Sequence, residues 1–335
     1  MSIAFTAGCI ARGSQDIRRC APVNSFGKQN TFEQQMAQET ATPNLHRIDA
    51  ADIPSLKADM DLPAEPLIKI RARRAFDLMN LREIWQHREL LYFLVWRDLK
   101  ARYKQTILGI LWVILQPLMM TLVFTIFLGK LVRVETGATP YPLFLYAGLL
   151  PWIFFSNAVS SGSYSILASS QMITKVYLPR LIIPAAAVSV RLSDFLVASL
   201  VLIVLMRYYG IHLGWQILLL PALMLELTLL SLALSALLSA LNVKYRDTGT
   251  ALPVMLQVWM FASPIVYPRS LVPARWEWAY QINPLTGIIE GFRSAFLGLP
   301  INRQGLALSW LVTIILLVIS MFVFRRLEDD FADIV

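Results

Sequence analysis

The sequence predicts an all-α integral membrane protein with six transmembrane helices, an N-terminal amphipathic interface helix, and a re-entrant or interfacial helix between the fifth and sixth spans. Of the 335 residues, 56% are hydrophobic and only 16% are charged, whereas soluble domains carry about 25% charged residues. The apolar residues also fall into blocks of roughly 19–27, the length that crosses about 30 Å of hydrocarbon at about 1.5 Å per residue.

Residues 1–79 precede the first apolar block and show no sustained hydrophobic period. Their mixture of Gln, Asp, Ser and Thr is typical of disorder, so we expect a largely disordered cytoplasmic extension. Met60 and Met79 are alternative start sites within it. Cys9 and Cys20, the two cysteines of the chain, have neither a disulfide framework nor metal-ligand spacing.

Residues 80–104 have the pattern of an amphipathic helix that lies on the membrane surface. Apolar side chains recur at helical spacing at Leu81, Ile84, Trp85, Leu91, Tyr92, Val95, Trp96, Leu99 and Tyr103. The other face is basic and carries Arg82, Arg88, Arg97, Lys100, Arg102 and Lys104. Trp and Tyr beside Lys and Arg suit the headgroup zone, which favours an interface helix over the alternative of a soluble surface helix.

Residues 105–325 form the predicted six-helix transmembrane domain, and residues 326–335 form a cytoplasmic tail. The expected spans are about 107–128, 141–162, 181–206, 215–241, 248–267 and 305–324. Between the last two, Pro284–Leu299 has apolar residues at helical spacing over a length too short to cross the bilayer. We expect this element at the outer mouth of a pore, because irregular backbone at membrane depth needs protein or water around it.

Six spans place both termini on one side, which the positive-inside rule identifies as the cytoplasm. Besides the flank of the first span, the basic residues on this side are Lys175, Arg180, Lys244, Arg246, Arg325 and Arg326. The opposite side breaks the rule with Arg269, Arg275, Arg293 and Arg303. Because the net charge of +8 is concentrated beside the first span, it indicates contact with an anionic membrane surface rather than with nucleic acid.

No G-x-x-x-x-G-K-[ST] phosphate loop occurs in the sequence, so the chain lacks the usual backbone cradle for ATP phosphates. His46, His87 and His212 lie in widely separated segments, which argues against a metal site or histidine-based catalysis. We therefore expect no catalytic residue, metal or cofactor in this chain. An integral membrane glycosyltransferase is the rival class, but it would need acidic clusters in loops that are short and basic here.

Three charged residues fall inside predicted spans, where charge is costly and is usually functional or paired. Arg191 and Asp194 share a face of the third span at i, i+3, and Glu226 lies in the fourth span. At about 1.5 Å per residue, Arg191 and Glu226 both lie near mid-bilayer. We expect a charge cluster that holds the third and fourth spans together; the alternative is a polar lining of a transport path.

Three short stretches carry a resemblance to a known family. They are Leu94–Lys104 with Leu108-Gly109, Leu111-Trp112 and Gln116-Pro117; Lys175–Arg180; and Asn242–Asp247 with Ile282–Pro284 and Phe331–Asp333. Over about residues 80–335 the chain resembles the membrane subunits of ABC-type polysaccharide exporters, which move lipid-linked O-antigen, capsule or teichoic-acid chains. The extension 1–79 departs from the compact start that is usual in this family.

The resemblance implies a homodimer of this chain in a bacterial inner membrane, together with a separate ATPase subunit that binds ATP and Mg. It implies a continuous channel for a lipid-linked glycan and an interface helix with candidate residues Trp85, Trp96, Arg97, Lys100 and Arg102. It also implies a coupling helix that contacts the ATPase through Lys175, Tyr177, Pro179 and Arg180. The alternative to the coupling helix is an ordinary basic loop that follows the positive-inside rule. The alternative substrate is a smaller lipid or drug.

Two pairs of residues are candidates for the lining of such a channel. Trp112 and Gln116 share one helical face, and Trp259 and Ser263 share another, because each pair is four residues apart. An aromatic ring can stack on a sugar while its polar neighbour binds hydroxyl groups, and many weak contacts let a polymer slide. The alternative for the tryptophans is lipid-facing or interfacial anchoring.

Overall fold

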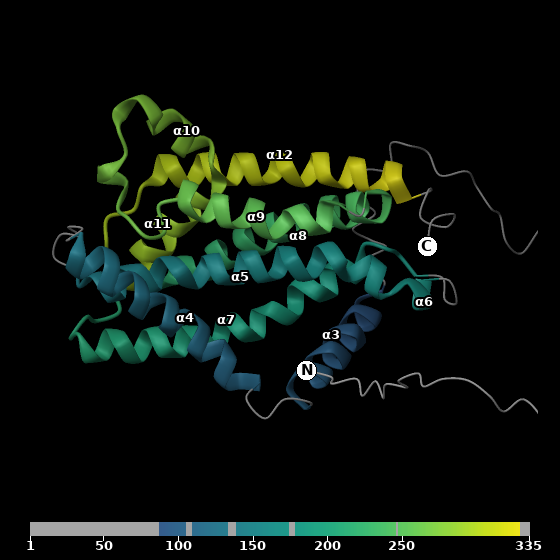
Figure 1. Cartoon of the computed structure of the whole chain (residues 1–335), viewed down its shortest axis with the longest axis horizontal. Coiled ribbons are helices and arrows are strands. Elements are labelled where there is room, and N and C mark those ends of the chain that lie inside the picture. The colour runs from purple at the N-terminus through teal and green to yellow at the C-terminus, as the bar shows by residue number, and fades with distance from the viewer. Residues whose placement is uncertain (1–86, 105–108, 133–138, 174–177, 246, 329–335) are drawn as a thin grey trace, which may run out of the picture. The chain divides into compact units, whose positions relative to one another are not determined.

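The computed structural model describes residues 87–104, 109–132, 139–173, 178–245 and 247–328, and every regular element in these ranges is a helix (Figure 1). The prediction of an all-α protein is confirmed for this part of the chain. All the described residues lie in the unit Arg73–Val335. The predicted extension 1–79 and the first residues of the predicted interface helix lie outside the described residues.

The described part of the chain contains five helical segments that are long and apolar enough to cross a membrane. They are Gly109–Leu131, which joins α4 (Gly109–Phe124) to a π-helical end; Tyr141–Ala168 (α5); Ile182–Tyr208 (α7); Trp215–Lys244, which contains α8 (Leu220–Lys244); and Arg303–Glu328 (α12). They correspond to the predicted spans one to four and six. The second and sixth extend beyond their predicted ends to Ala168 and Glu328.

The predicted fifth span, 248–267, is shorter than expected. Its helix, α9, runs over Asp247–Ala262 and has 16 residues. At about 1.5 Å per residue it is about 24 Å long, less than the hydrocarbon thickness of about 30 Å. Pro264 and Pro268 follow at once, and proline cannot continue a helix. By helix length alone, the described residues therefore contain five spans rather than six.

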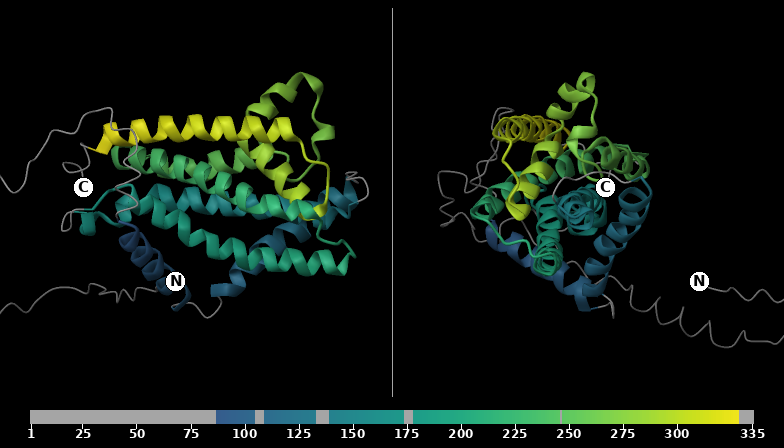
Figure 2. Two further views of the ribbon diagram at one scale, coloured as in Figure 1. Left: turned by 180° about the vertical axis from the view of Figure 1, so that it is seen from behind. Right: turned by 90° about the vertical axis from the view of Figure 1, so that its left-hand side faces the viewer.

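α5 is the central helix of the described residues. In its most hydrophobic window 78% of the residues are buried, against 11–33% in the other four candidate spans. α4, α7, α8, α9 and the short α11 (Pro284–Leu297) all contact α5, which the end-on view shows surrounded (Figure 2). The outer helices keep apolar side chains exposed, as expected of a surface that faces lipid.

Small residues let α5 and α8 approach each other closely. A methyl group at Gly162 of α5 would collide with the side chain of Ser235 on α8. The Ser235 hydroxyl also donates a hydrogen bond to the Ala158 carbonyl at 3.3 Å, across the same interface. Close packing and such interhelical hydrogen bonds stabilise helix pairs in a membrane, where the hydrophobic effect does not drive association.

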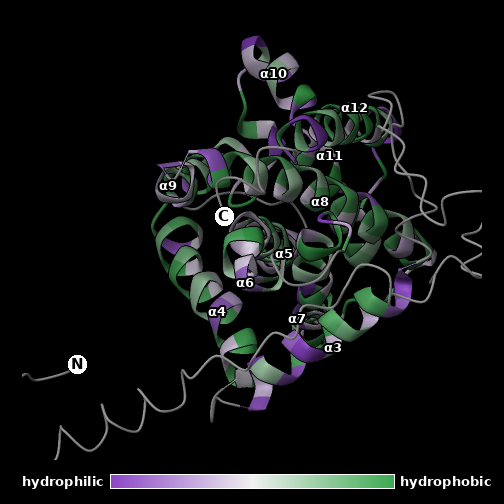
Figure 3. Ribbon diagram, turned by 90° about the vertical axis from the view of Figure 1, so that its right-hand side faces the viewer, coloured by the Kyte–Doolittle hydropathy of each residue, from purple (hydrophilic) through white to green (hydrophobic). Residues whose placement is uncertain are grey.

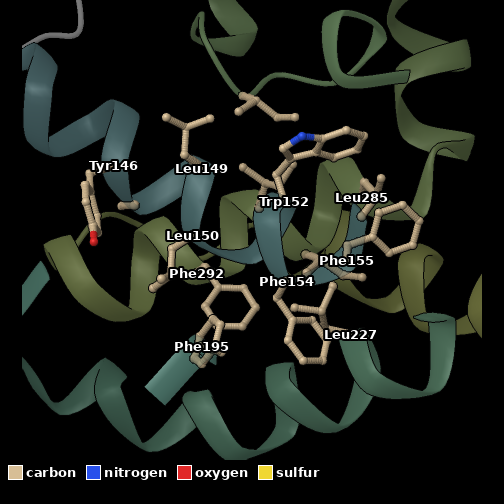
Figure 4. Packing of buried hydrophobic residues seen from close by; sticks show 14 of the residues in the cluster. Tyr146, Leu149, Leu150, Trp152, Phe154, Phe155, Phe195, Leu227, Leu285 and Phe292 are labelled. Atoms are coloured by element: carbon tan, nitrogen blue, oxygen red, sulfur yellow. The ribbon is translucent and has the colours of Figure 1, made fainter. Parts of the chain in front are cut away.

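Aromatic side chains join α5 to its neighbours (Figure 4). Phe154 of α5 lies edge-on to Phe195 of α7, with ring centroids 5.9 Å apart, and Phe195 lies 5.7 Å from Phe292 of α11. On the other side Phe155 is edge-on to Trp259 of α9 at 5.4 Å. Edge-to-face contacts of this kind stabilise a core beyond the area that they bury.

The segment between α9 and α12 folds into α10 (Glu277–Ile282) and α11. Asn283 caps α11 by accepting a hydrogen bond from the Leu285 amide at 3.2 Å. Gly298 ends α11 with a φ of 70°, a left-handed conformation that favours glycine. Every residue of α11 except Glu290 is buried, so the predicted short helix is present and belongs to the core.

The helix α3 (Arg88–Lys104) packs along α7. Leu94 is buried against Ile182 and Ala186 of α7, with Leu90, Leu91 and Val95 beside it. Tyr92 and Trp96, two residues of the predicted apolar face, point away from α7 and are 69% and 51% exposed. Hydrophilic and hydrophobic residues alternate along α3 (Figure 3), and its exposed side chains include both aromatic Trp96 and basic Arg97.

Candidate functional site

A polar cluster joins α3 to α5 and α7, with Asp194 of α7 at its centre. Asp194 forms ion pairs with Arg102 of α3 at 3.0 Å and with Arg191 of α7 at 3.4 Å. The Tyr103 hydroxyl donates a hydrogen bond to Asp194 at 2.9 Å, and Arg191 Nε donates to Ser161 of α5 at 2.9 Å. The structure therefore brings together Arg191 and Asp194, as predicted, and adds two residues of α3.

The cluster is only partly open to solvent. The side chains of Arg102, Arg191 and Asp194 are 33%, 21% and 13% exposed. Both guanidinium groups pair with the same carboxylate oxygen of Asp194. At the end of α3, burial raises the pKa of the Tyr103 hydroxyl, which therefore remains a hydrogen-bond donor to Asp194 at neutral pH.

Trp112 and Gln116, one of the two predicted channel pairs, lie on a small cavity that the polar cluster also lines. The cavity holds about 80 Å³ and its other lining residues include Arg102, Leu150, Ile153, Phe154, Asn157, Arg191, Asp194 and Phe195. Pockets for drug-sized ligands usually hold about 300–1,000 Å³, so this space in one subunit is too small for a glycan chain. Arg191 and Asp194 line this cavity, and their predicted alternative role in a transport path stays a prediction.

The other predicted pair, Trp259 and Ser263, does not lie on this cavity. The Trp259 indole donates to Asn283 Oδ1 at 3.1 Å, and Asn283 Nδ2 donates to the buried Ser263 hydroxyl at 2.9 Å. Because Asn283 is also the N-cap of α11, this arrangement fixes α11 to the end of α9. In this conformation the pair positions a helix.

Glu226 is fully buried, and it does not make the contact with Arg191 that the sequence predicted. Ser309 of α12 contacts its Oε1, and Oε2 has no hydrogen-bond partner among the described residues. The predicted cluster of Arg191 with Glu226 is therefore wrong. The reason is helix rotation: α7 turns Arg191 toward α3 and α5, whereas α8 turns Glu226 toward α12.

Arg293 of α11 is a buried charge whose role the sequence did not indicate. It is 4% exposed, and its guanidinium donates to the carbonyls of Pro264, Ile265 and Phe144 at 2.7, 2.6 and 3.3 Å. Its central carbon lies 3.6 Å from the centroid of the Phe144 ring. Arg293 thus departs from the positive-inside rule because its charge is used inside the protein. In the sequence, its position among the apolar residues of α11 was the feature that could have indicated its burial.

The sequence matches the ABC-2 type transporter family over residues 89–297, from α3 to the end of α11. This match covers more than half of the 335 residues. The chain belongs to the ABC-2 type transporter family. The matched region contains the cavity beside Trp112, the buried Arg293 and the contact between Trp259 and Asn283.

Individual relatives in this family agree with the resemblance predicted from the sequence. The O-antigen export system permease protein RfbA of Myxococcus xanthus is 33% identical over 258 residues, which cover 76% of this chain and 98% of that protein. An RfbA of Klebsiella pneumoniae is 28% identical over 248 residues, covering 73% and 95%. The polysialic acid transport protein KpsM of Escherichia coli is 27% identical over 242 residues, covering 70% and 91%. The predicted family is confirmed.

Asn242 joins three helices at one end of this ABC-2 family member. Its Nδ2 donates to the Ser163 carbonyl of α5 at 3.2 Å, and its Oδ1 accepts from the Gly249 amide of α9 at 3.1 Å. The Tyr164 hydroxyl donates to the Gly249 carbonyl at 2.7 Å. A methyl group at Gly249 would lie 2.7 Å from that hydroxyl and 3.0 Å from Asn242 Oδ1, so a larger residue here would displace these side chains.

Two of the four residues predicted to couple to the ATPase, Lys175 and Tyr177, lie outside the described residues. Pro179 accepts a backbone hydrogen bond from Ile182 at 3.0 Å as α7 begins. Arg180 donates to the backbone carbonyl of Glu328 at the end of α12. The loop before α7 is therefore joined to the end of α12, near the end of α8.

The candidate residues of the interface helix point in two different directions. Trp85 lies outside the described residues. Trp96 and Lys100 are exposed, and Arg97 pairs with its neighbour Asp98 at 2.8 Å. Arg102 instead points inward to Asp194. One helix thus combines an outward surface of aromatic and basic groups with an inward charge.

Proposed function

We propose that this chain is the channel-forming membrane subunit of an ATP-driven exporter that moves a lipid-linked polysaccharide, such as O-antigen, across the bacterial inner membrane. The observation that carries the proposal is the similarity to RfbA permease proteins over 95–98% of their length. Because the sequence has no phosphate loop, ATP and Mg are bound by a separate ATPase subunit. Its docking surface is made by Lys175, Tyr177, Pro179 and Arg180, together with the end of α12 that Arg180 contacts.

The working unit in this proposal is a homodimer with six spans in each copy and both termini in the cytoplasm. α9 is the fifth span, completed by residues 263–267, and α11 lies at membrane depth on the outer side. Apolar faces support the dimer: Val254 and Val258 of α9 are 63% and 65% exposed, and Trp112 of α4 is 58% exposed. A second copy covers these faces, and the channel runs between the two copies.

The interface helix α3 lies in the headgroup zone of the inner leaflet. Its exposed Tyr92, Phe93 and Trp96 suit that zone, where aromatic rings and basic groups are both favoured. Arg102 and Tyr103 fasten the helix to α7, so that a movement of α3 reaches the charged cavity directly. This connection offers a route from the cytoplasmic surface to the transport path.

Deletion of the gene in a strain that displays the polymer tests the proposal. Lipid-linked polymer should remain on the cytoplasmic side, and surface polymer should return when this chain is supplied with its partner ATPase. An ATPase whose phosphate-loop lysine is replaced should not restore it. Normal surface polymer after deletion would refute the proposal. Loss of a smaller lipid from the outer leaflet would favour the alternative substrate, and loss of polymer synthesis would favour a glycosyltransferase.

A further inference from the structure

The segment 268–282, which contains α10, carries large apolar side chains on its surface. Leu271, Trp276, Trp278 and Ile282 are each more than half exposed. Trp276 directly precedes α10 and Trp278 lies in its first turn, and side chains two residues apart on a helix do not face the same way. One flat surface of a partner protein would therefore cover only one of the two rings, whereas a layer that surrounds the segment covers both.

The position of α10 beside α12 indicates that this layer is the membrane surface. α10 contacts α12, projects sideways from it, and does not extend past the ends of the neighbouring helices (Figures 1 and 2). α12 has 26 residues and is therefore about 39 Å long, which exceeds the hydrocarbon core of about 30 Å. Its first residues, Arg303 and Gln304, are polar, so its first turn lies in the headgroup zone, at the level of α10.

The exposed apolar surface of α12 supports this placement. Six exposed apolar residues of α12 recur three and four apart and so lie on one face: Leu311, Ile314, Ile315, Val318, Ile319 and Phe322. A face of this kind suits the hydrocarbon of the membrane. The lipid-facing surface of the protein therefore continues from α12 onto the element that contacts its first part.

The charged residues of the segment have different partners. Arg269 pairs with Glu277 at 2.8 Å and with Glu290 of α11 at 3.6 Å, so it fastens the segment to α11. Arg275 is exposed, and the part of the chain that the structure describes contains no ion pair to it. Tryptophan beside arginine is typical of the membrane–water interface, where a guanidinium group binds lipid phosphate.

We propose that the segment 268–282 lies in the headgroup zone of the outer leaflet, with Trp276 and Trp278 among the lipid headgroups and Arg275 at the phosphate of an anionic phospholipid. This inference rests on the proposed function, which places the segment outside, and adds a lipid partner for it. The Tyr280 hydroxyl contacts that of Tyr267, which follows α9. Through this contact and through Arg269, the lipid fixes the outer ends of α9 and α11.

Quenching by nitroxide lipids tests this placement. Cys9 and Cys20 are replaced by serine, and a fluorescent maleimide is attached to Trp276→Cys or Trp278→Cys in the full chain with its partner ATPase in phosphatidylcholine nanodiscs. A nitroxide on the lipid headgroup should quench both labels more strongly than a nitroxide at the middle of the acyl chain. Ile315→Cys, on the exposed face of α12, should show the reverse order.

Two results would overturn the proposal. Quenching of only one of the two α10 labels would show that the segment is covered on one side by protein. Quenching of neither label, together with a disulfide between Trp278→Cys residues of two chains, would assign the surface to a second copy. Quenching of neither label without such a disulfide would place the segment in water, where the exported glycan is the remaining partner.

The role of Arg275 is tested with anionic lipid. The apparent local concentration of nitroxide phosphatidylglycerol at the Trp278→Cys label should exceed that of nitroxide phosphatidylcholine about fivefold, the factor expected for one basic residue beside anionic lipid. Arg275→Gln should remove this preference. Arg207→Gln makes the same charge change at the end of α7 and should keep it. Loss of the preference in both variants, or in neither, would show that Arg275 does not bind the phosphate.

Failure of the lipid contact and failure of the proposed function give different results. If neither label meets lipid while gene deletion still traps polymer inside the cell, the lipid contact is wrong and the exporter remains. If deletion leaves surface polymer unchanged, the exporter itself is wrong.

Discussion

Glu226 of α8 and Ser309 of α12 meet in the core at a point where the Ser309 hydroxyl also lies 2.8 Å from the Pro284 carbonyl of α11. A serine hydroxyl has one hydrogen and can donate to only one of these two acceptors. A neutral carboxyl group removes the conflict, because Glu226 then donates to Ser309 and Ser309 donates to Pro284. The contact thus joins three helices when Glu226 holds a proton.

The first prediction separates a neutral Glu226 from a charged one. Glu226→Gln supplies an N–H donor in the same place and should leave thermal unfolding in detergent nearly unchanged. Glu226→Ala leaves Ser309 without this partner in the core and should lower the free energy of unfolding by about 1–3 kcal/mol. If the glutamine variant lost as much stability as the alanine variant, the side chain would have to be charged.

The second prediction concerns the anchor of α11. Arg293→Ala removes the donors to the Phe144, Pro264 and Ile265 carbonyls and should lower the free energy of unfolding by about 1–3 kcal/mol or more, the cost of leaving buried acceptors without a partner. Arg293→Lys should rescue little, since an ammonium group cannot reproduce the planar fork. Unfolding temperature and proteolysis of the 268–282 segment are the measurements.

Two further variants give this prediction its controls. Arg275→Ala removes an exposed arginine of the same outer segment and should have little effect. Gly148→Ala should resemble Arg293→Ala in direction, because its methyl group would lie 2.6 Å from the Arg293 guanidinium. Equal stability of the Arg293→Ala and Arg275→Ala variants would show that Arg293 does not anchor α11.

The sequence predicted helix positions better than helix rotations. Apolar blocks of membrane length mark five spans because the bilayer requires them, and these spans are present near their predicted positions. The direction of a side chain is harder to predict, because lipid and protein interior are equally apolar. For this reason the sequence did not show which apolar residues of α3 pack on α7: Leu94 is buried there, whereas Tyr92 and Trp96 are exposed.

The difficulty of predicting helix rotation also explains why the contacts of the candidate site were predicted only in part. Arg191 and Asp194 share one helix, so their contact follows from i, i+3 spacing alone. A contact of Arg191 with Glu226 would have required knowledge of how α7 and α8 are turned. The role of Asn283 could not be predicted either, because it depends on three residues brought together from the end of α9 and the start of α11.

A third prediction concerns the Asn242 contact. Asn242→Ala leaves the Gly249 amide and the Ser163 carbonyl without their partner and should lower the free energy of unfolding by about 1–3 kcal/mol. Tyr164→Phe, which loses the hydroxyl that holds the other side of Gly249, should cost less, because Tyr164 is 45% exposed and water can replace it. The double variant should deviate from additivity, since both residues hold the backbone of Gly249, one at its amide and the other at its carbonyl. Strict additivity would show that they act separately.

The last prediction tests whether α9 crosses the membrane. With Cys9 and Cys20 replaced by serine, single cysteines at the exposed positions His212, Ser270 and Arg326 are treated with a membrane-impermeant maleimide in intact cells. Six spans place His212 and Ser270 outside and Arg326 inside, so the first two should react at once and Arg326→Cys only after the membrane is opened. A 16-residue α9 that only dips into the bilayer would leave Ser270 on the side of Lys244, and Ser270→Cys would then be protected in intact cells. Reaction of Ser270→Cys together with His212→Cys therefore decides for six spans, because the 263–267 segment must then complete the crossing that the length of α9 alone does not provide.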